Sequence, residues 1–453
     1  MKTMTMLTAL ALLTGGVRAE TAEWKISDCL VGTIGKASHA PGEEMVFTVG
    51  LRGFAGLDRG TVSLVWERTG DDGKKEGGKA PLKEKFVYRT SLDRPGFVRF
   101  FGTLVGPDGR PVKQLAHGKL RSVTCDLGAG VEVLGIRQAV PEPADFDAFW
   151  AKHKANLATV PWKDAVTLKE IASPTEGVKL YEFSVPCFGG KPATGHLAVP
   201  TDASRKLPAI AHFFGYNESW TFSRSIQPPK KLDRNALGMY VSAHGFEMGH
   251  DEAYYKAERQ KARSNGFGHG FDPAQNADPE KSYYAGMTYR LMRALEYLKS
   301  RPEWNGRDLV VSGASQGGLQ SIWAGALVPG VSEVRASIPW NCDIGGTELG
   351  RNRGDWYVKW VPALGYYDAC NHGKRIPKTC RMVIPGAGMG DYTCPPTGVF
   401  AFYNAVTAPK EMTLVQNMEH GRRLQPPPLQ TFVLEGDAFK KSQTGKVSER
   451  GVK

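Results

Sequence analysis

The chain has 453 residues, of which 41% are hydrophobic and 10% aromatic, and its formal net charge is +12. The composition excludes a disordered protein, and the length allows two or three domains. The positive charge is spread along the chain without a long run of lysine and arginine, so we predict no nucleic-acid partner. Beyond the first residues, no stretch offers the ~20 apolar residues of a membrane span.

The N-terminus has the pattern of an export signal. Lys2 precedes an apolar run at residues 6–13, and small residues then lead to Ala19. A basic start, an apolar core and a small-residue cleavage site are typical of a secretory signal peptide. We therefore predict that residues 1–19 are a signal peptide, cleaved after Ala19, and that the protein is secreted or periplasmic. The alternative is an ordinary buried N-terminal helix.

Seven cysteines are compatible with an oxidising compartment but do not define a disulfide framework. The odd count leaves at least one thiol unpaired. Cys29 and Cys125 flank the N-terminal part and are a plausible pair, as are Cys370 and Cys380 in a short loop. No two cysteines have C-x-x-C spacing, so the sequence gives no support to a zinc ribbon or a thioredoxin-like motif.

Residues 20–138 are predicted to form a small all-β sandwich domain. Runs of β-branched and aromatic residues at 45–49, 62–66 and 86–88 predict short strands, and turn clusters rich in glycine and aspartate separate them. Short strands at this spacing are typical of a β-sandwich. No candidate catalytic side chains gather here, so we expect an accessory domain.

The pattern changes near residue 139, where we place the start of a catalytic α/β domain that extends to residue 453. A helix is predicted from residue 144, because Phe146, Phe149 and Trp150 share one helical face. Strands and helices then alternate, which indicates a mainly parallel sheet with helices on both faces. The predicted elements are strands at 166–171, 180–185, 207–214, 239–243, 309–312, 334–338, 381–384 and 412–415, and a helix at 287–298.

The sharpest motif is G-x-S-x-G at residues 313–317, with Ser315 at its centre. A predicted strand precedes it and a predicted helix at 319–327 follows it. This strand–turn–helix context is that of the nucleophile elbow of α/β-hydrolases, in which the turn exposes the serine hydroxyl above the sheet. The alternative is a glycine-rich turn with a structural serine.

A nucleophilic serine needs a base and an orienting acid, which follow it in the order acid, then histidine, in this fold. His420 directly follows a predicted strand and is the preferred base over His372. Asp391 lies just past the preceding strand, in a loop rich in glycine and proline. It is the preferred acid, with Asp343 as the runner-up and Glu419 less suited.

The oxyanion formed during acyl transfer needs fixed N–H donors. One is expected to be the backbone N–H of Gln316, the residue after the nucleophile. The second is expected from the loop after the strand at 207–214, and we select the backbone N–H of Tyr216.

Together, four motifs resemble the acetyl xylan esterase and cephalosporin C deacetylase family of carbohydrate esterases. They are residues 214–217 (FGYN), 313–318 (GASQGG), 390–396 (GDYTCPP) and 419–421 (EHG). The resemblance covers roughly residues 140–440, including the helix that contains Phe146. It implies an α/β-hydrolase fold, no metal or other cofactor, and removal of acetyl groups from sugar hydroxyls. It also implies a Ser315, Asp391 and His420 triad, with Tyr216 and Gln316 as oxyanion donors.

The chain departs from the family in two places. Residues 244–247 read HGFE where the family usually has an Arg-Gly-Gln motif, which leaves the oligomeric state open. The N-terminal β-domain and the export signal are additions to the compact members. These additions favour a secreted two-domain enzyme that acts on polysaccharide or its fragments.

Two further groups of residues are candidates for binding. Trp356 and Trp360 lie in an aromatic stretch before Asp391 and are candidates for stacking on a sugar, with an aromatic core as the alternative. His244, His250 and the acidic residues 251–252 have no established metal-ligand spacing, so we expect no metal.

Two rival functions remain open at this point. The same fold and triad serve other esters and peptides, because the triad does not determine the acyl group. A catalytically silent carbohydrate-binding protein is the second rival, although the intact serine, aspartate and histidine argue against it.

Overall fold

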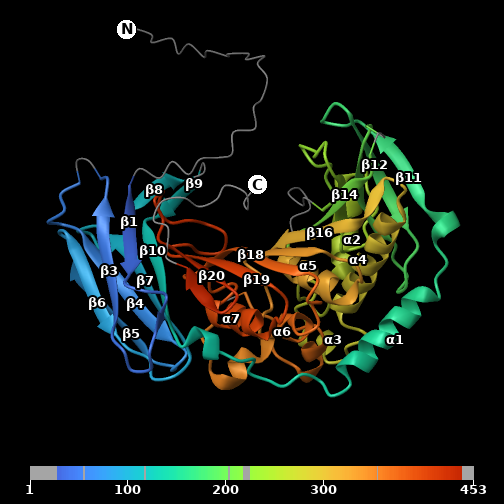
Figure 1. Cartoon of the computed structure of the whole chain (residues 1–453). Coiled ribbons are helices and arrows are strands. Elements are labelled where there is room, and N and C mark those ends of the chain that lie inside the picture. The colour runs from blue at the N-terminus through green and yellow to red at the C-terminus, as the bar shows by residue number, and fades with distance from the viewer. Residues whose placement is uncertain are drawn as a thin grey trace, which may run out of the picture.

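The computed structural model describes residues 28–54, 57–116, 119–202, 205–217, 225–354 and 356–440. The predicted signal peptide lies outside these residues. The described chain divides into a β region, residues 29–131, and an α/β region, residues 139–440, which lie side by side (Figure 1).

The β region is built from ten strands in three sheets. They are β1 (Cys29–Ile34), β2 (Ser38–His39), β3 (Met45–Arg52), β4 (Ser63–Gly70), β5 (Lys75–Pro81), β6 (Lys85–Thr90), β7 (Gly96–Val105), β8 (Lys113–Ala116), β9 (Lys119–Ser122) and β10 (Thr124–Val131). The sheets have the orders β1-β3-β6, β2-β10-β7-β4-β5 and β8-β9.

Alternation of apolar side chains explains how two of these sheets face each other. On β3, Met45, Phe47 and Val49 are fully buried, and the residues between them are half-buried. The ring of Phe47 stacks on that of Phe100 on β7, with centroids 5.6 Å apart. The three-stranded and five-stranded sheets therefore bury a common apolar layer between them.

A short connection leads into the α/β region. It contains the 3₁₀ turn η1 (Val133–Gly135) and then helix α1 (Phe146–Ala158). The predicted apolar face of α1 is buried, as Phe146, Phe149 and Trp150 show. Apolar contact also joins the two regions directly, because Phe97 of β7 stacks on Phe400 with centroids 5.5 Å apart. One continuous hydrophobic core therefore extends through both regions.

In the part of the chain that the structure describes, the α/β region contains an eleven-stranded sheet. In spatial order its strands are β11 (Thr167–Ile171), β12 (Val178–Val185), β13 (Ala193–Pro200), β15 (Leu237–Ser242), β14 (Leu207–Phe213), β16 (Trp304–Ala314), β17 (Glu333–Ser337), β18 (Arg381–Gly388), β19 (Lys410–Val415), β20 (Thr431–Glu435) and β21 (Ala438–Lys440). The strands from β15 to β19 are parallel, and the strands at both ends of the sheet are antiparallel.

The strand order creates a natural place for a site. From β14 the chain first adds β15 on one side and later β16 on the other side. In open α/β sheets, ligands bind at the carboxyl ends of the strands where the order reverses in this way. The loops after β14 and β16, which contain Tyr216 and Ser315, both leave the sheet at this edge.

The arrangement of the helices in the α/β region differs from the expected one. They are α2 (Glu252–Ala262), α3 (Pro273–Asn276), α4 (Tyr283–Ser300), α5 (Gln316–Leu327), α6 (Ala369–Gly373) and α7 (Pro396–Ala405). Helices α4, α5 and α7 contact the sheet, and α4 to α7 also contact one another in sequence, so they form one layer on one face (Figure 1). The expectation of helices on both faces is wrong for the described residues.

Burial along the strands gives the physical reason. On β14, Leu207, Ala209 and Ala211 are buried, whereas Ile210 and His212 on the opposite face are only half-buried. A sheet that helices cover on both faces has continuous buried runs instead of such alternation. Among the helices that the structure describes, none combines the length and the apolar character that crossing a membrane requires.

The two expected disulfide pairs are also wrong, because all seven cysteines are free and buried. Cys29 lies on the three-stranded sheet and Cys125 on the five-stranded sheet. Cys370 belongs to α6, and Cys380 directly precedes β18. Each thiol fills space in the core, where burial raises the pKa of Cys125 and Cys380.

Candidate active site

The turn that contains Ser315 has the geometry of a nucleophile elbow. Ser315 lies between the end of β16 and the start of α5, with φ 57° and ψ −123°. A non-glycine residue in this conformation costs about 1–3 kcal/mol, which the surrounding structure must offset. The neighbouring glycines permit the turn: a Cβ on Gly313 would lie 2.4 Å from the Gly317 carbonyl oxygen, and one on Gly317 would lie 2.5 Å from that of Phe213.

Ser315, His420 and Asp391 form a continuous hydrogen-bonded chain. His420 Nε2 lies 3.0 Å from Ser315 Oγ, and His420 Nδ1 lies 3.0 Å from Asp391 Oδ2. An ionised carboxylate only accepts hydrogen bonds, so Nδ1 donates to Asp391 and Nε2 accepts from the serine hydroxyl. The three residues follow β16, β18 and β19, which are parallel neighbours or near neighbours, so their loops meet at one edge of the sheet.

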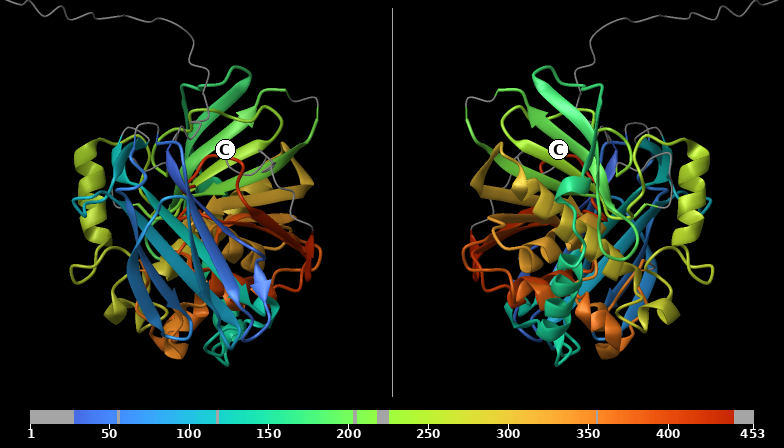
Figure 2. Two further views of the ribbon diagram at one scale, coloured as in Figure 1. Left: turned by 90° about the vertical axis from the view of Figure 1, so that its left-hand side faces the viewer. Right: turned by 90° about the vertical axis from the view of Figure 1, so that its right-hand side faces the viewer.

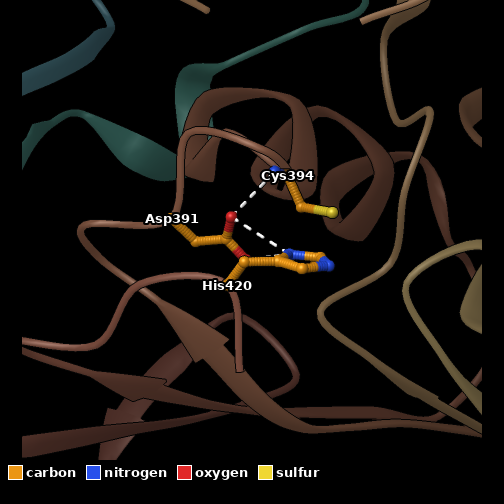
Figure 3. A group of neighbouring side chains, drawn as sticks. All are labelled: Asp391, Cys394 and His420. Carbon is orange, nitrogen blue, oxygen red and sulfur yellow. Dashed lines mark hydrogen bonds and ion pairs between the residues drawn. The ribbon is translucent and has the colours of Figure 1, made fainter. Parts of the chain in front are cut away.

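Asp391 is held firmly by its own loop. Its side chain is 1% exposed, and Oδ1 accepts hydrogen bonds from the backbone N–H groups of Thr393 at 3.0 Å and Cys394 at 2.9 Å. Figure 3 shows the carboxylate between the backbone of Cys394 and the His420 ring. The next residues, Pro395 and Pro396, lead directly into α7. Hydrogen bonds and a stiff backbone therefore orient the acid toward the histidine.

Asp391, Cys394 and His420 also bring three possible metal-ligand atoms within 4.8 Å of one another. The geometry argues against their use as ligands. Both ring nitrogens of His420 already have partners, Ser315 and Asp391. Burial raises the pKa of the Cys394 thiol well above its usual range, and the thiol must lose its proton to bind a metal. The group therefore fits a hydrogen-bonded relay better than a metal centre.

Backbone N–H groups from two segments lie next to Ser315. Gln316 is the first residue of α5, where helical N–H groups have no partner within the helix. The loop after β14 approaches from the other side, since a Cβ on Gly215 would lie 3.7 Å from Ser315 Cβ. Gln320 Nε2 donates to the Phe214 carbonyl at 3.0 Å and ties this loop to α5. Gln316 directly follows Ser315, and Gly215, the residue before Tyr216, lies beside it, so both expected donor segments border the nucleophile.

An aromatic group surrounds the side chain of Tyr216. Its ring stacks on His269 at 4.1 Å and contacts Phe271 at 5.2 Å, Trp356 at 5.5 Å and Trp340 at 6.2 Å. Trp340 also reaches the nucleophile, because its backbone N–H donates to the Ser315 carbonyl at 3.2 Å. Sequence reasoning missed His269, Phe271 and Trp340. Of these, only Trp340 could have been predicted, because it closely follows the strand at 334–338, which lies next to the strand that precedes Ser315.

The two tryptophans selected from the sequence have different surroundings. Trp356 belongs to the aromatic group around Tyr216 and is 51% exposed, so it can meet a ligand. Trp360 is partly buried against the core, near Gly345 and Gly365. A tryptophan in such contacts fills space between elements, which was the alternative considered for this aromatic stretch.

The rejected alternatives for base and acid have structural partners. His372 is fully buried, its Nε2 lies 2.9 Å from the Tyr366 carbonyl, and burial lowers its pKa to about 3. Asp343 accepts from the Ala139 N–H at 2.7 Å and pairs with Arg351. Glu419 pairs with Arg422 instead of reaching the histidine. None of these contacts involves the Ser315 hydroxyl.

The residues that were weighed as metal ligands do not converge. His244 Nδ1 lies 2.8 Å from the Tyr283 hydroxyl, whereas His250 Nε2 lies 3.0 Å from Glu247. Asp251 caps α2 by accepting from the Tyr254 N–H at 2.9 Å. Each side chain therefore has a separate local role.

Strand β10 of the β region supports the loops of the site. The sequence analysis did not predict this support. Asn417 Oδ1 accepts from the Asp126 N–H at 3.0 Å, and Asn417 Nδ2 donates to the Leu30 carbonyl at 2.9 Å. Gln416 makes two hydrogen bonds to the backbone of Gly128, at 2.9 and 2.8 Å. Both side chains precede His420 in the same loop, so the β region anchors that loop.

An ion pair between the half-buried Arg99 and the buried Asp126 supports the loop that contains Asp391 in the same way. Arg99 donates to both oxygens of Asp126 at 2.8 and 2.6 Å, and its guanidinium lies 4.5 Å from the centre of the Tyr392 ring. A Cβ on Gly390 would lie 2.4 Å from the Asp126 carbonyl oxygen, so the two backbones are in close contact. Figure 2 shows that the β region lies against the sheet that contains these loops.

A comparison with protein families identifies the chain. The model of the family described as acetyl xylan esterase (AXE1) matches residues 131–347 and 354–427, which is more than half of the chain. The chain belongs to the acetyl xylan esterase family. This membership confirms the resemblance drawn from the four motifs, and it makes the protein a carboxylic ester hydrolase. The match begins at the last residue of β10 and leaves the rest of the β region outside it.

Individual relatives agree with the family. Acetyl esterase Axe7A of Xylanibacter ruminicola is 29% identical over 360 residues, which span 76% of this chain and 75% of that protein. A solved acetyl xylan esterase from a Paenibacillus species has a TM-score of 0.53 at 23% identity, over 64% of this chain and 93% of its own. Acetyl xylan esterase 1 from a Thermoanaerobacterium species has a TM-score of 0.51 at 21% identity, and the match covers 66% of this chain and 93% of that protein. The two structures show a common α/β-hydrolase fold.

Proposed function

We propose that this protein is an exported serine esterase that removes acetyl groups from acetylated carbohydrate of the xylan type. The observation that carries the proposal is the chain from Ser315 Oγ through His420 to Asp391, with both links at 3.0 Å. Family membership and the acetyl esterase relatives support the acyl group and the class of substrate. Export rests on the signal-like pattern of residues 1–19.

The reaction divides into two acyl transfers. Ser315 Oγ attacks the acetyl carbonyl carbon while His420 Nε2 takes the hydroxyl proton. The backbone N–H groups of Gln316 and Tyr216 stabilise the oxyanion. The tetrahedral intermediate expels the sugar oxygen, which takes the proton from His420 and leaves an acetyl-serine. Water then repeats the sequence with His420 as base and releases acetate. Asp391 holds the ring in the required tautomer throughout.

We propose the same division of the chain that the sequence suggested. Residues 1–19 are a signal peptide, residues 20–138 a β-sandwich accessory domain and residues 139–453 the catalytic domain. The facing sheets and the shared layer of Phe47 and Phe100 support the sandwich. Trp356, half-exposed beside Tyr216, is the candidate for contact with the sugar. The rim of the site then comes from several loops of the catalytic domain.

Acetate release from 4-nitrophenyl acetate and from acetylated xylan tests the proposal, with Ser315→Ala beside the wild type. Loss of a triad nucleophile lowers kcat by about 10⁴-fold or more, because little beyond binding and the oxyanion donors remains. Turnover of both substrates by the wild type alone supports the proposal. Turnover of only the small ester supports the triad but refutes the polysaccharide, and equal activity of Ser315→Ala refutes the mechanism.

A further inference from the structure

A solvent-open cleft lies beside the loop of His420, where the β region meets the α/β region. The β8–β9 hairpin and the start of β10 form one wall, and residues 422–424 form the other. Three arginines line it: Arg121 from β9, and Arg422 and Arg423 from the loop. The ester chemistry described above uses none of them.

The charge in this cleft is not balanced. Arg422 is paired with Glu419, to which its Nε donates at 2.9 Å. Arg121 and Arg423 form no ion pair with any residue that the structure describes. Arg121 Nε is buried and has no hydrogen-bond partner among the described residues. A buried donor without a partner is unfavourable, so an anion bound in the cleft would satisfy a group that is otherwise unsatisfied.

The hairpin contributes more positive charge on the same side. Its register places Gln114 opposite Arg121 and Ala116 opposite Lys119. Side chains alternate between the two faces of a strand, so Lys119 lies on the same face of the hairpin as Arg121. Lys119 is exposed and forms no ion pair with a described residue. The wall contributed by the β region therefore has Arg121 among uncharged lining residues, with Lys119 nearby on the same face and no acidic side chain in the lining.

The cleft is close in the chain to the catalytic histidine. Met418 and Arg423 pair across the loop that contains His420, and the Leu424 N–H donates to the Asn417 carbonyl at 2.9 Å. Arg423 therefore lies at the base of the narrow loop that presents His420. The loop that presents His420 to Ser315 therefore also contributes a wall of the cleft, which connects the cleft to the ester site through one short segment.

We propose that this cleft binds the carboxylate of a hexuronic acid unit and thereby selects acetylated polysaccharides that contain such units over neutral ones. A guanidinium presents a planar fork of donors that matches a carboxylate, and these charge-assisted bonds are strong. The proposal rests on the proposed esterase function and names the substrate class of that site. The net charge of +12 adds long-range attraction toward an acidic polymer.

The test compares one acetylated glucuronoxylan before and after its carboxyl groups are converted to methylamides. Variants Arg121→Gln and Arg423→Gln remove the cleft charges. Arg307→Gln is the matched control, because Arg307 is exposed, pairs only with its neighbour Asp308 and lies at the opposite end of β16 from Ser315. The kcat/KM for acetate release is measured on both polymers, and 4-nitrophenyl acetate reports on the triad.

We expect the wild type to favour the acidic polymer by about 10-fold at low salt, because two charge-assisted contacts are at stake. Each cleft variant lowers this preference by about 3-fold or more, and ~0.5 M salt lowers it in the wild type. Arg307→Gln keeps the preference, and 4-nitrophenyl acetate turnover of each variant corrects its kcat/KM for any change at the triad, because the preference is a ratio between two polymers. Equal kcat/KM on the two polymers in the wild type, or equal loss in Arg307→Gln, overturns the proposal.

Binding without turnover separates this proposal from the esterase function. Migration of Ser315→Ala in gels that contain either polymer reports binding alone. Retardation by the acidic polymer that is lost with Arg121→Gln and Arg423→Gln supports the cleft even if no acetate is released in the activity assays. Retardation that these two changes leave intact refutes the cleft, whatever the activity of the wild type.

Discussion

The β region and the α/β region contribute to the site in different ways. The α/β region supplies Ser315, His420 and Asp391, each from a loop at the carboxyl edge of the parallel strands. The β region supplies none of these groups, yet β10 hydrogen-bonds to Gln416 and Asn417 beside the histidine. The side chains of the proposed triad and the contacts that hold their loops therefore come from different parts of the chain, and separate substitutions can test each part.

The largest expected effect comes from the ion pair on the β side. Arg99→Met leaves the buried carboxylate of Asp126 without its partner and removes the guanidinium from Tyr392. Breaking a buried pair in this way lowers the free energy of unfolding by about 3–5 kcal/mol. Denaturant unfolding followed by tryptophan fluorescence measures the change. Arg94→Met, which removes an exposed arginine paired only with Asp93, is the control, and an equal loss there contradicts the role given to Arg99.

A substitution in the α/β region, on the other side of its contact with β10, tests more directly whether the β region positions His420. Asn417→Ala leaves the Asp126 N–H and the Leu30 carbonyl without partners, which lowers the free energy of unfolding by about 1–3 kcal/mol. Because the same loop contains His420, kcat for 4-nitrophenyl acetate falls by about 10-fold, with a smaller change in KM.

Asn235→Ala is the control for this experiment, since Asn235 bonds to exposed partners only. Steady-state kinetics at a temperature where both variants remain folded separates catalysis from stability. A kcat for Asn417→Ala equal to that of the wild type shows that the β region contributes stability without positioning the base.

A smaller effect comes from buried histidines, most of which lie in the α/β region, although burial also lowers the pKa of His39 in the β region. Burial lowers the pKa of His196 and His212 to about 4 and that of His269 and His372 to about 3, and all four belong to the α/β region. The unfolded chain takes up these protons near pH 6.5 and the folded chain does not, so stability falls as the pH drops below 6.5. Each such histidine contributes up to about 1.4 kcal/mol per pH unit.

His372→Gln removes one of these groups. Its free energy of unfolding between pH 6.5 and pH 4.5 is expected to decline less steeply than that of the wild type, even where its overall stability is lower. Denaturant unfolding at several pH values measures the slope, which the loss of packing alone does not change. A slope identical to that of the wild type means that His372 takes up its proton without unfolding.

The residues of the proposed triad could be predicted from short sequence motifs. A serine elbow needs glycines on both sides, and the base and the acid need loops that follow parallel strands, so short motifs pointed to Ser315, Asp391 and His420. The structure places these three side chains in hydrogen-bonding contact. Family membership confirmed the resemblance that the motifs suggested.

Features that depend on distant contacts were not predictable. Strand β13 is buried along its whole length but contains alanine, glycine and histidine, so its composition gave no strand signal. The bond from Asp126 to Asn417 joins positions 291 residues apart. The face of the sheet without helices shows in the half-buried side chains of β14, whose apolar sequence was interpreted as part of a sheet with helices on both faces.

The seven buried, unpaired thiols have a consequence for how the protein can be handled. No covalent cross-link contributes to its stability, so the fold forms without an oxidant or a disulfide isomerase. The same native state is accessible in a reducing cytosol and in an oxidising medium, and added reductant leaves it intact. Redox conditions therefore need not be matched when the esterase activity of this chain is compared across hosts and buffers.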